Sequence, residues 1–274
     1  MIHPVCTSTR TALSVNLNKV ALLRNSRGGV LPDPLAAARV AIAAGCQGIT
    51  LHPRPDLRHA RPDDAHALRA LCTSVELNLE GNPYAGADGR YPGFMQLLEA
   101  CRPEQATLVP DADAQLTSDH GWDLRAEGAR LRPLIARLRA AGIRVSLFLD
   151  VDSPDIERAA EIGAQRIELY TGPYAHAALA GDAGAQLDAC ARAVLDVVPD
   201  APWCGWSLGG SVALHAASIA PWRIHALTML CATPKFVVAD DWPQGMPRAV
   251  FKGFAEGLRG DWRMTIDRFI ALEA

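Results

Sequence analysis

Polar side chains that can move protons or bind anions recur along the first two thirds of the chain, at the ends of short apolar runs. They are Asn16, Asn18, His52, Arg54, Glu80, Thr117 and Glu168. A carboxylate and an imidazole can pass a proton between them, and an arginine can hold a phosphate through paired donors. Because burying an unpaired polar group costs free energy, polar residues that end apolar strands need partners or a function.

Each of these side chains also has a purely structural interpretation. His52 could be a buried histidine whose hydrogen bonds are satisfied, and Glu80 and Glu168 could form ion pairs with arginines. The arginines concerned are Arg54, Arg58 and Arg166. The set is more informative than any member, because the ends of parallel strands converge in a barrel. We therefore expect a functional site there.

The elements that must position these residues repeat a pattern of helix, glycine and strand. Three segments show the pattern, at residues 43–51, 140–148 and 161–169. In each, a helix-like stretch ends at a glycine, which can adopt the left-handed conformation that closes a helix, and a short apolar strand follows. Repetition of this unit is typical of βα architecture with a parallel sheet.

We expect six βα units in the first 197 residues. Asp33-Pro34 and Ser153-Pro154 each place a capping side chain before a proline that suits the first helical turn. The fold class is α/β of the (β/α)8 TIM-barrel type, which needs two more strands and carries active sites at the carboxyl ends of its strands. The predicted strands lie near 14–18, 48–52, 75–80, 105–109, 144–150 and 166–170, and the predicted helices near 34–44, 63–72, 92–101, 124–141, 154–162 and 184–197.

Length, charge and cysteine content restrict the class of protein. The 274 residues suffice for one large barrel or two ordinary domains. A net charge of −3 and a pI of about 6.2 argue against nucleic-acid or membrane partners. The seven cysteines are scattered without a C-x-x-C pair, so we expect neither disulfides nor a metal site. Residues 1–13 are interpreted as a poorly ordered leader without a secretory or membrane-spanning run, which favours a cytoplasmic protein.

Several segments resemble, in order, the motifs of the pyridoxine 5′-phosphate synthase family. They are residues 14–28 (SVNLNKVALLRNSRG), 48–59 (GITLHPRPDLRH), 78–80 (NLE), 108–110 (LVP), 115–118 (QLTS), 145–148 (VSLF) and 167–172 (IELYTG). The resemblance implies an enzyme of vitamin B6 biosynthesis that condenses 1-deoxy-D-xylulose 5-phosphate with 3-amino-2-oxopropyl phosphate. It also implies that no metal or organic cofactor takes part, and that the protein is a homo-oligomer.

The same resemblance implies roles for individual residues. His52 and Glu80 would be general acid/base residues, and Glu168 would stabilise cationic or polar intermediates. Asn16 and Arg27 would bind the aminoketone phosphate. The pentulose phosphate would be held by Asn18, Lys19, Arg54, His59 and Thr117. Some family members carry Asp and His at the positions of Asn18 and Lys19, so Lys19 would contact a phosphate as a point charge.

The resemblance to this family stops after residue 195. An Asn-Ala-Gly-His-like segment expected in the seventh strand and a Gly-His expected in the eighth are missing. Residues 205–210 read Gly-Trp-Ser-Leu-Gly-Gly instead, which is the G-x-S-x-G pattern of a nucleophile elbow centred on Ser207. With their flanks they resemble the α/β-hydrolase pimeloyl-[acyl-carrier protein] methyl ester esterase of biotin biosynthesis. The hydrolase triad is incomplete, because no Asp followed by a His comes after Ser207.

We therefore expect a leader at 1–13, a barrel portion at 14–197 and a hydrolase-like fragment at 198–274. The fragment has strand-like runs at 202–206 and 226–231 with a helix between them. It could complete the barrel, with 226–231 pairing with 14–18, or form a separate appendage. Three functions stay open: a pyridoxine 5′-phosphate synthase, intact or impaired by loss of its last strands; a carboxylesterase acting through Ser207; and an inactive fusion protein.

Overall fold

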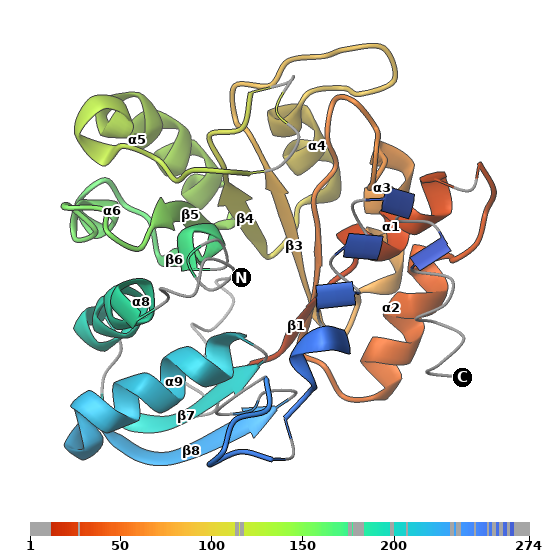
Figure 1. Ribbon diagram of the computed structural model, residues 1–274. Coiled ribbons are helices and arrows are strands. Elements are labelled where there is room, and N and C mark those ends of the chain that lie inside the picture. Colours follow the sequence, from red (N-terminus) through yellow and green to blue (C-terminus); the bar gives the residue numbers. More distant parts are fainter. Residues whose placement is uncertain are drawn as a thin grey trace. The chain divides into compact units, whose positions relative to one another are not determined.

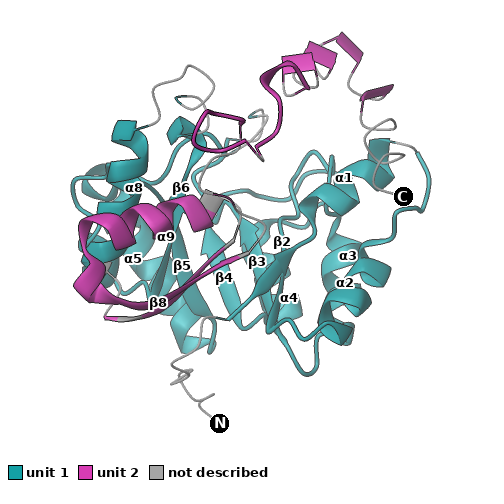
Figure 2. Cartoon of the chain, turned by 60° about the horizontal axis from the view of Figure 1, so that its bottom comes forward, with its two compact units in different colours: residues 1–198 teal, residues 199–274 magenta. Residues whose placement is uncertain are grey.

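The computed structural model describes the chain from residue 12 to residue 265, with gaps. The gaps are residues 27, 113–114, 116–117, 175–176, 178–183, 198–199, 207, 231–232, 234–236, 244, 251, 254–255, 258–259 and 262–263. The chain divides into two compact units, residues 1–198 and residues 199–274, coloured teal and magenta in Figure 2. Each unit is described by itself. In the described residues, no helix has the length and apolar character that a membrane span requires.

The first unit contains a parallel six-stranded sheet in which every strand pairs with its neighbour in the chain (Figure 1). The strands are β1 (Ser14–Asn16), β2 (Gly48–Leu51), β3 (Glu76–Gly81), β4 (Gln105–Leu108), β5 (Arg144–Asp150) and β6 (Arg166–Tyr170). The helices between and after them are α1 (Asn18–Ser26), α2 (Pro34–Ala43), α3 (Pro62–Leu71), α4 (Phe94–Cys101), α5 (Leu124–Ala140), α6 (Arg158–Glu161) and α8 (Gly184–Val197). The sequence therefore correctly predicts an α/β fold with βα units, but the described parallel sheet has six strands rather than eight.

Four helix ends in this unit follow the predicted chemistry, but the cap expected at Ser153-Pro154 does not form, because α6 begins only after Glu157. Gly45, Gly142 and Gly163 have φ angles of 92°, 82° and 100°, the left-handed conformation expected where a helix gives way to a strand. Asp33 accepts hydrogen bonds from the first backbone N–H groups of α2, and Pro34 opens that helix. These ends make the connections to β2, β5 and β6 short, so each strand returns to the sheet directly.

Side chains alternate along the strands, with one face apolar and the other polar. Ile49, Leu77 and Leu147 belong to the apolar core, together with helix residues such as Leu68 and Leu131. This face packs on the helices, as βα architecture requires. Because successive side chains point to opposite faces of a sheet, the intervening polar residues share the inner face.

A buried polar layer crosses the inner face of β1 to β4. The Thr50 hydroxyl lies 2.8 Å from the Ser14 hydroxyl and accepts a hydrogen bond from the Asn78 amide (3.3 Å). The Thr107 hydroxyl in turn donates to the side-chain Oδ1 of Asn78 (3.1 Å). His52 and Glu80 follow Thr50 and Asn78 by two residues, so they lie one layer further toward the carboxyl ends of the strands.

Two local predictions in this unit are wrong. The strand expected at 14–18 ends at Asn16, because the Asn16 side chain accepts a hydrogen bond from the Asn18 N–H (2.9 Å) and helix α1 begins there. The helix expected at 154–162 is confined to α6. The N–H groups of Arg158 and Ala159 bond to carbonyls three residues earlier, so the segment before α6 forms turns rather than α-helix.

The second unit contains a parallel βαβ arrangement. Strand β7 (Ala201–Trp206), helix α9 (Leu208–Ile219), the short 3-10 helix η1 (Pro221–Arg223) and strand β8 (Ile224–Leu230) follow one another. This order matches the predicted strand, helix and strand. In the described residues β8 pairs with β7 and β1 pairs with β2. The pairing of 226–231 with 14–18 that barrel closure requires would join the two units, so it stays a prediction.

Gly121 makes a close backbone approach that can be tested. A Cβ atom at this buried position would clash with the backbone of Leu149 and Asp150 on β5. The next residue, Trp122, donates from its backbone to Phe148 and from its indole to Leu108. Gly121→Ala should therefore force β5 away and lower the free energy of unfolding by about 2 kcal/mol or more.

Urea unfolding of the two variants Gly121→Ala and Gly86→Ala would measure this effect. A Cβ at Gly86 meets no atom within 4 Å, so the second variant is the matched control and should change stability little. Equal stability of the two variants would contradict the prediction.

Candidate active site at the carboxyl ends of the strands

Glu80, near the end of β3, is the centre of a polar cluster built from three segments of the chain. Its Oε2 atom accepts hydrogen bonds from the side-chain amides of Asn18 (3.2 Å) and Asn16 (3.5 Å) and lies 3.9 Å from Nδ1 of His52. The side-chain Oδ1 of Asn18 accepts from the backbone N–H of His52 (2.7 Å), which ties the start of α1 to the end of β2. Four residues chosen from the sequence therefore lie together.

Burial gives this cluster unusual protonation states. Burial, and next the charge of Glu168, raise the pKa of Glu80 to about 8, although the hydrogen bonds from Asn18 and Asn16 act against the rise. Burial also lowers the pKa of His52 well below its ordinary value, with further lowering by Arg54, His59 and Arg58. At neutral pH the pair is thus a protonated carboxyl group beside a neutral imidazole, not an ion pair.

Glu168, on β6, faces the same side of the sheet as Glu80. Two strands separate β3 from β6, which in a flat sheet would place them about 14 Å apart. The charge of Glu168 nevertheless raises the pKa of Glu80, which is explained by a sheet that curls so that its inner-face residues approach. Glu168 keeps access to solvent on the edge strand, yet desolvation by the surrounding protein raises its own pKa too.

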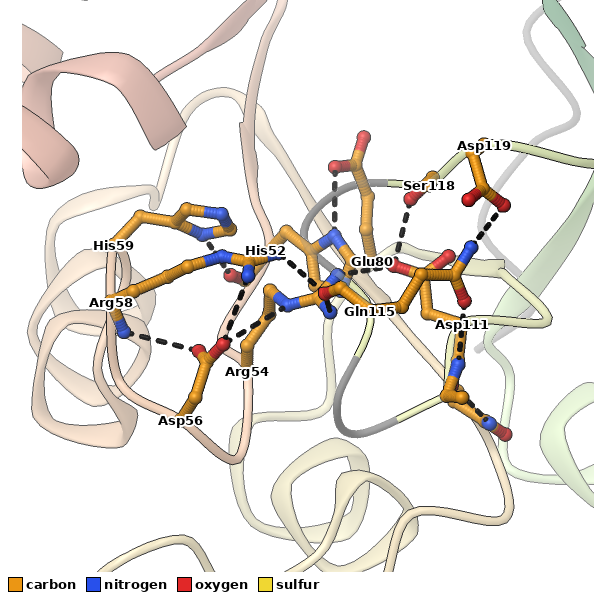
Figure 3. Close-up of polar contacts among 12 residues, drawn as sticks. His52, Arg54, Asp56, Arg58, His59, Glu80, Asp111, Gln115, Ser118 and Asp119 are labelled. Atoms are coloured by element: carbon orange, nitrogen blue, oxygen red, sulfur yellow. Dashed lines mark hydrogen bonds and ion pairs between the residues drawn. The ribbon is translucent and has the colours of Figure 1, made fainter.

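Arg54 lies beside this pair and is almost completely buried, with 3% of its side chain exposed. Its guanidinium forms an ion pair with Asp111 and donates to the carbonyl oxygen of Gln115 (2.6 Å) (Figure 3). Arg58 donates to the same carbonyl (3.0 Å), and the Ser118 hydroxyl donates to Asp111 (2.8 Å). The segment after β4 is thereby held against the loop that follows β2.

Two buried polar atoms at this ion pair have no hydrogen-bond partner in the described structure, Nε of Arg54 and Oδ1 of Asp111. Nε of Arg54 lies 3.9 Å from Asp56, beyond hydrogen-bonding distance. Buried polar groups are normally paired, so an unpaired guanidinium donor at a strand end is a position where an anionic group would gain a partner.

His59 completes the cluster on the side of β2. Its Nδ1 lies 3.2 Å from the backbone carbonyl oxygen of His52, and the two imidazole rings are 5.9 Å apart. Because a carbonyl only accepts, Nδ1 of His59 carries the proton and Nε2 is left free to accept. Partial burial lowers the pKa of His59 from its ordinary value, and the charges of Arg58 and Arg54 add to this lowering.

The remaining predicted residues differ in what the structure shows. Lys19 is exposed on α1, one residue after Asn18. Arg27, Thr117 and Ser207 lie outside the described residues. In the part of the chain that is described, no group of three or more His, Cys, Asp or Glu side chains could hold a metal ion.

Asp111 is the residue that sequence reasoning missed. It follows β4 closely, as Glu80 ends β3, so the same signal of a carboxylate at a strand end could have found it. Its partner Arg54 is 57 residues away in the chain, so the ion pair itself is a tertiary feature.

Comparisons with known proteins agree with this geometry. The family model described as "Pyridoxal phosphate biosynthesis protein PdxJ" matches residues 13–198. Pyridoxine 5′-phosphate synthase of Xanthomonas axonopodis pv. citri (strain 306) is 59% identical over 185 residues, which are 67% of this chain and 72% of that protein. The enzyme of the same name from Xanthomonas campestris pv. campestris (strain B100) is 60% identical over 169 residues, 61% of this chain and 66% of that protein.

A third relative of the same name, from Xylella fastidiosa (strain 9a5c), is 54% identical over 182 residues, 66% of this chain and 70% of that protein. The matches thus span about two thirds to three quarters of these relatives. The chain belongs to the family of the pyridoxal phosphate biosynthesis protein PdxJ and is an enzyme of vitamin B6 biosynthesis.

Proposed function

We propose that the first unit catalyses the condensation of 1-deoxy-D-xylulose 5-phosphate with 3-amino-2-oxopropyl phosphate, which yields pyridoxine 5′-phosphate, inorganic phosphate and water. The observation that carries the proposal is the buried Glu80 carboxyl group, 3.9 Å from Nδ1 of His52, with the buried Arg54 at the end of the neighbouring strand. Imine formation, dehydration and phosphate elimination each need a proton delivered or removed, and two phosphorylated substrates need cationic partners.

The protonation states support different roles for Glu80 and His52, one as a proton donor and the other as a proton acceptor. A protonated Glu80 can donate a proton to a departing hydroxyl or phosphate, and a neutral His52 can accept a proton from carbon or nitrogen. Glu168 would then stabilise cationic intermediates from β6, on the same inner face of the curled sheet. The amides of Asn16 and Asn18 hold Glu80 in place, and Asn16 would also bind the aminoketone phosphate.

The phosphate of the pentulose would bind on the Arg54 side, together with Asn18, Lys19, His59 and Thr117. Arg54 supports this assignment through its unpaired Nε, and His59 through its free Nε2. The aminoketone phosphate would bind at Asn16 and Arg27. In this proposal the chemistry uses protein groups alone, without a metal or organic cofactor.

The direct test is to incubate the purified protein with both phosphorylated substrates and to measure pyridoxine 5′-phosphate by chromatography. We expect product from the parent and a rate at least about 100-fold lower for His52→Ala, because a general acid/base group is lost. Ser207→Ala should leave the rate unchanged. Absence of product from the parent protein would refute the proposed activity.

A second candidate function is ester hydrolysis by the second unit, and one observation favours it. A Cβ atom at Gly205 would clash with Gly209 and Gly210, so the end of β7 and the first turn of α9 approach as closely as the glycines of a nucleophile elbow allow. In this alternative Ser207 is the nucleophile, and 198–274 is a hydrolase-like fragment. Hydrolysis of short acyl esters that is lost in Ser207→Ala but kept in His52→Ala would support it.

We also propose that the protein is cytoplasmic and forms homo-oligomers. Large apolar side chains that face solvent in the first unit support self-association, because an isolated monomer gains nothing from exposing them. They are Val30 (79% exposed), Leu31 (69%) and Val40 (71%).

A further inference from the structure

We propose that Asn25, on α1, is a positioning residue that fixes the backbone of residues 57–59 and thereby holds His59 at the active site. The contribution to substrate binding rests on the proposed function, but the structural role of Asn25 does not. Asn25 is not among the catalytic and binding residues that the sequence predicts.

The side-chain amide nitrogen of Asn25 is surrounded by carbonyl oxygens of one loop. It lies 3.0 Å from the carbonyl oxygen of Leu57, 3.0 Å from that of Arg58 and 2.6 Å from that of His59. Three successive carbonyls can converge on one point only if the chain turns sharply, and Leu57 adopts a φ of 54°, which is uncommon for a residue with a branched side chain. Without the Asn25 donor, the partly buried carbonyls of Leu57 and Arg58 would lose a hydrogen bond, and that of His59 would keep only the longer one from Arg24 (3.3 Å).

The orientation of the Asn25 amide is determined by its other neighbour. Nε of Arg24 donates to Oδ1 of Asn25 (3.1 Å), and a guanidinium can only donate. The oxygen of Asn25 must therefore face Arg24, and its NH₂ group must face the three carbonyls. The assignment thus follows from hydrogen-bond chemistry on both sides of the amide.

Arg24 is itself held rigidly. It is buried, with 6% of its surface exposed, and forms a two-pronged ion pair with Asp64 on α3, at 2.6 and 2.8 Å. Asp64 also accepts from the backbone N–H of Arg61 (2.8 Å), and Arg24 reaches the carbonyl oxygen of His59 (3.3 Å). Asn25 therefore links a fixed buried ion pair to the loop of residues 57–59.

The loop in turn places two side chains of the site. His59 bonds through Nδ1 to the backbone of His52, and Arg58 donates to the carbonyl oxygen of Gln115. A shift of the 57–59 backbone would carry both side chains with it, and His52 would lose the neighbour that packs on its ring. Asn25 touches none of the reacting groups, so it acts through His59 and Arg58.

The variant that separates this role from simple packing is Asn25→Asp. Aspartate has the same shape and still accepts from Arg24, but it turns a second acceptor toward the three carbonyls. Amide hydrogen exchange across residues 57–61 should accelerate by at least about tenfold, equivalent to the loss of one buried donor. Asn25→Ala should accelerate this exchange as well. It provides the test if the aspartate variant does not fold.

Glu104→Gln is the matched control. It is also an exchange between a carboxylate and an amide, but it lies at the amino end of β4, where Glu104 contacts Arg69 and the backbone of Leu77. This control should leave exchange across 57–61 at the parent rate. If Asn25→Asp also exchanges at the parent rate, the positioning role is refuted.

A second measurement links the role to substrate. Isothermal titration with 1-deoxy-D-xylulose 5-phosphate should give a dissociation constant at least about tenfold higher for Asn25→Asp than for the parent, and an unchanged one for Glu104→Gln. Equal dissociation constants for Asn25→Asp and the parent would overturn the link to the site. If the parent itself does not bind the sugar phosphate, the proposed function fails, and hydrogen exchange still decides the role of Asn25.

Discussion

Replacement of Glu80 by glutamine is expected to slow formation of pyridoxine 5′-phosphate by about 100- to 10,000-fold, the usual contribution of a general acid/base group. Glutamine keeps the acceptor toward Asn16 and Asn18 but cannot deliver a proton. The loss should therefore appear mainly in kcat, with KM for both substrates close to the parent values. If Glu80→Gln lowers kcat but the pH profile of the parent shows no ionisation of a proton-transfer group, Glu80 has a different role.

The same substitution should make the folded protein more resistant to alkaline pH. The pKa of Glu80 is about 8 in the folded state against an ordinary value of 4.5, so the folded state binds its proton more tightly than the unfolded state. The resulting stability is fully present below pH 4.5 and is lost as the pH rises through 8. Since the carboxyl group is buried, the loss is on the order of a few kcal/mol.

Urea unfolding at pH 6 and pH 9 would measure this difference. The parent should lose stability between the two values, and Glu80→Gln should lose less of it. Glu168 remains in the variant and its pKa is also raised, so a part of the decline will persist. His52 acts in the opposite direction, because its lowered pKa destabilises the fold as the pH falls below 6.5. Parallel pH profiles for parent and variant would show that Glu80 is ionised in the folded protein.

Asp111→Ala is expected to lower the free energy of unfolding by about 3–5 kcal/mol, since it leaves the buried charge of Arg54 without its partner. The two side chains are only 4% and 3% exposed, so water cannot replace the lost carboxylate. The matched control is Asp119→Ala in the same segment, where an exposed carboxylate contacts His120. That variant should change stability by less than about 0.5 kcal/mol.

The double variant Arg54→Met with Asp111→Leu distinguishes stability from function. Replacement of a buried ion pair by apolar side chains of similar volume is often neutral for stability, so unfolding should return close to the parent value. Binding of 1-deoxy-D-xylulose 5-phosphate should still be lost, because the guanidinium is gone. If Asp111→Ala costs no more stability than Asp119→Ala, the ion pair does not hold the segment after β4.

The main lines of the fold could be predicted because they depend on local chemistry. Glycines after α2, α5 and α6 and the apolar runs that follow them determine where strands begin, and both features are legible in the sequence. Helix α1 could not be predicted in the same way, because it begins where the Asn16 side chain binds the Asn18 N–H rather than at an apolar periodicity. A local bond between a side chain and the backbone two residues later decides this boundary, in competition with continuation of the strand.

The positions of the site residues could be predicted from the sequence better than their protonation states. Polar residues at strand ends indicated that Asn16, Asn18, His52 and Glu80 would meet, and the structure brings these four together. Their protonation depends on burial and on charges from distant strands, which no local pattern reports. The role of Asn25 depends on a loop more than 30 residues away, so its sequence neighbours gave no signal. The position of Asp111 after a strand could have been noticed, but its partner Arg54 lies 57 residues away.

The chain-ordered pairing of β1 to β6 has a consequence for biosynthesis of the protein itself. Each strand needs only the strand made just before it, so the sheet can grow from its amino-terminal end while the chain is still being synthesised. All groups of the Asn16, Asn18, His52 and Glu80 cluster lie within the first 81 residues, so this cluster can assemble on the nascent chain. The counter-ion of Arg54 emerges about 30 residues later, and until then that guanidinium must stay hydrated.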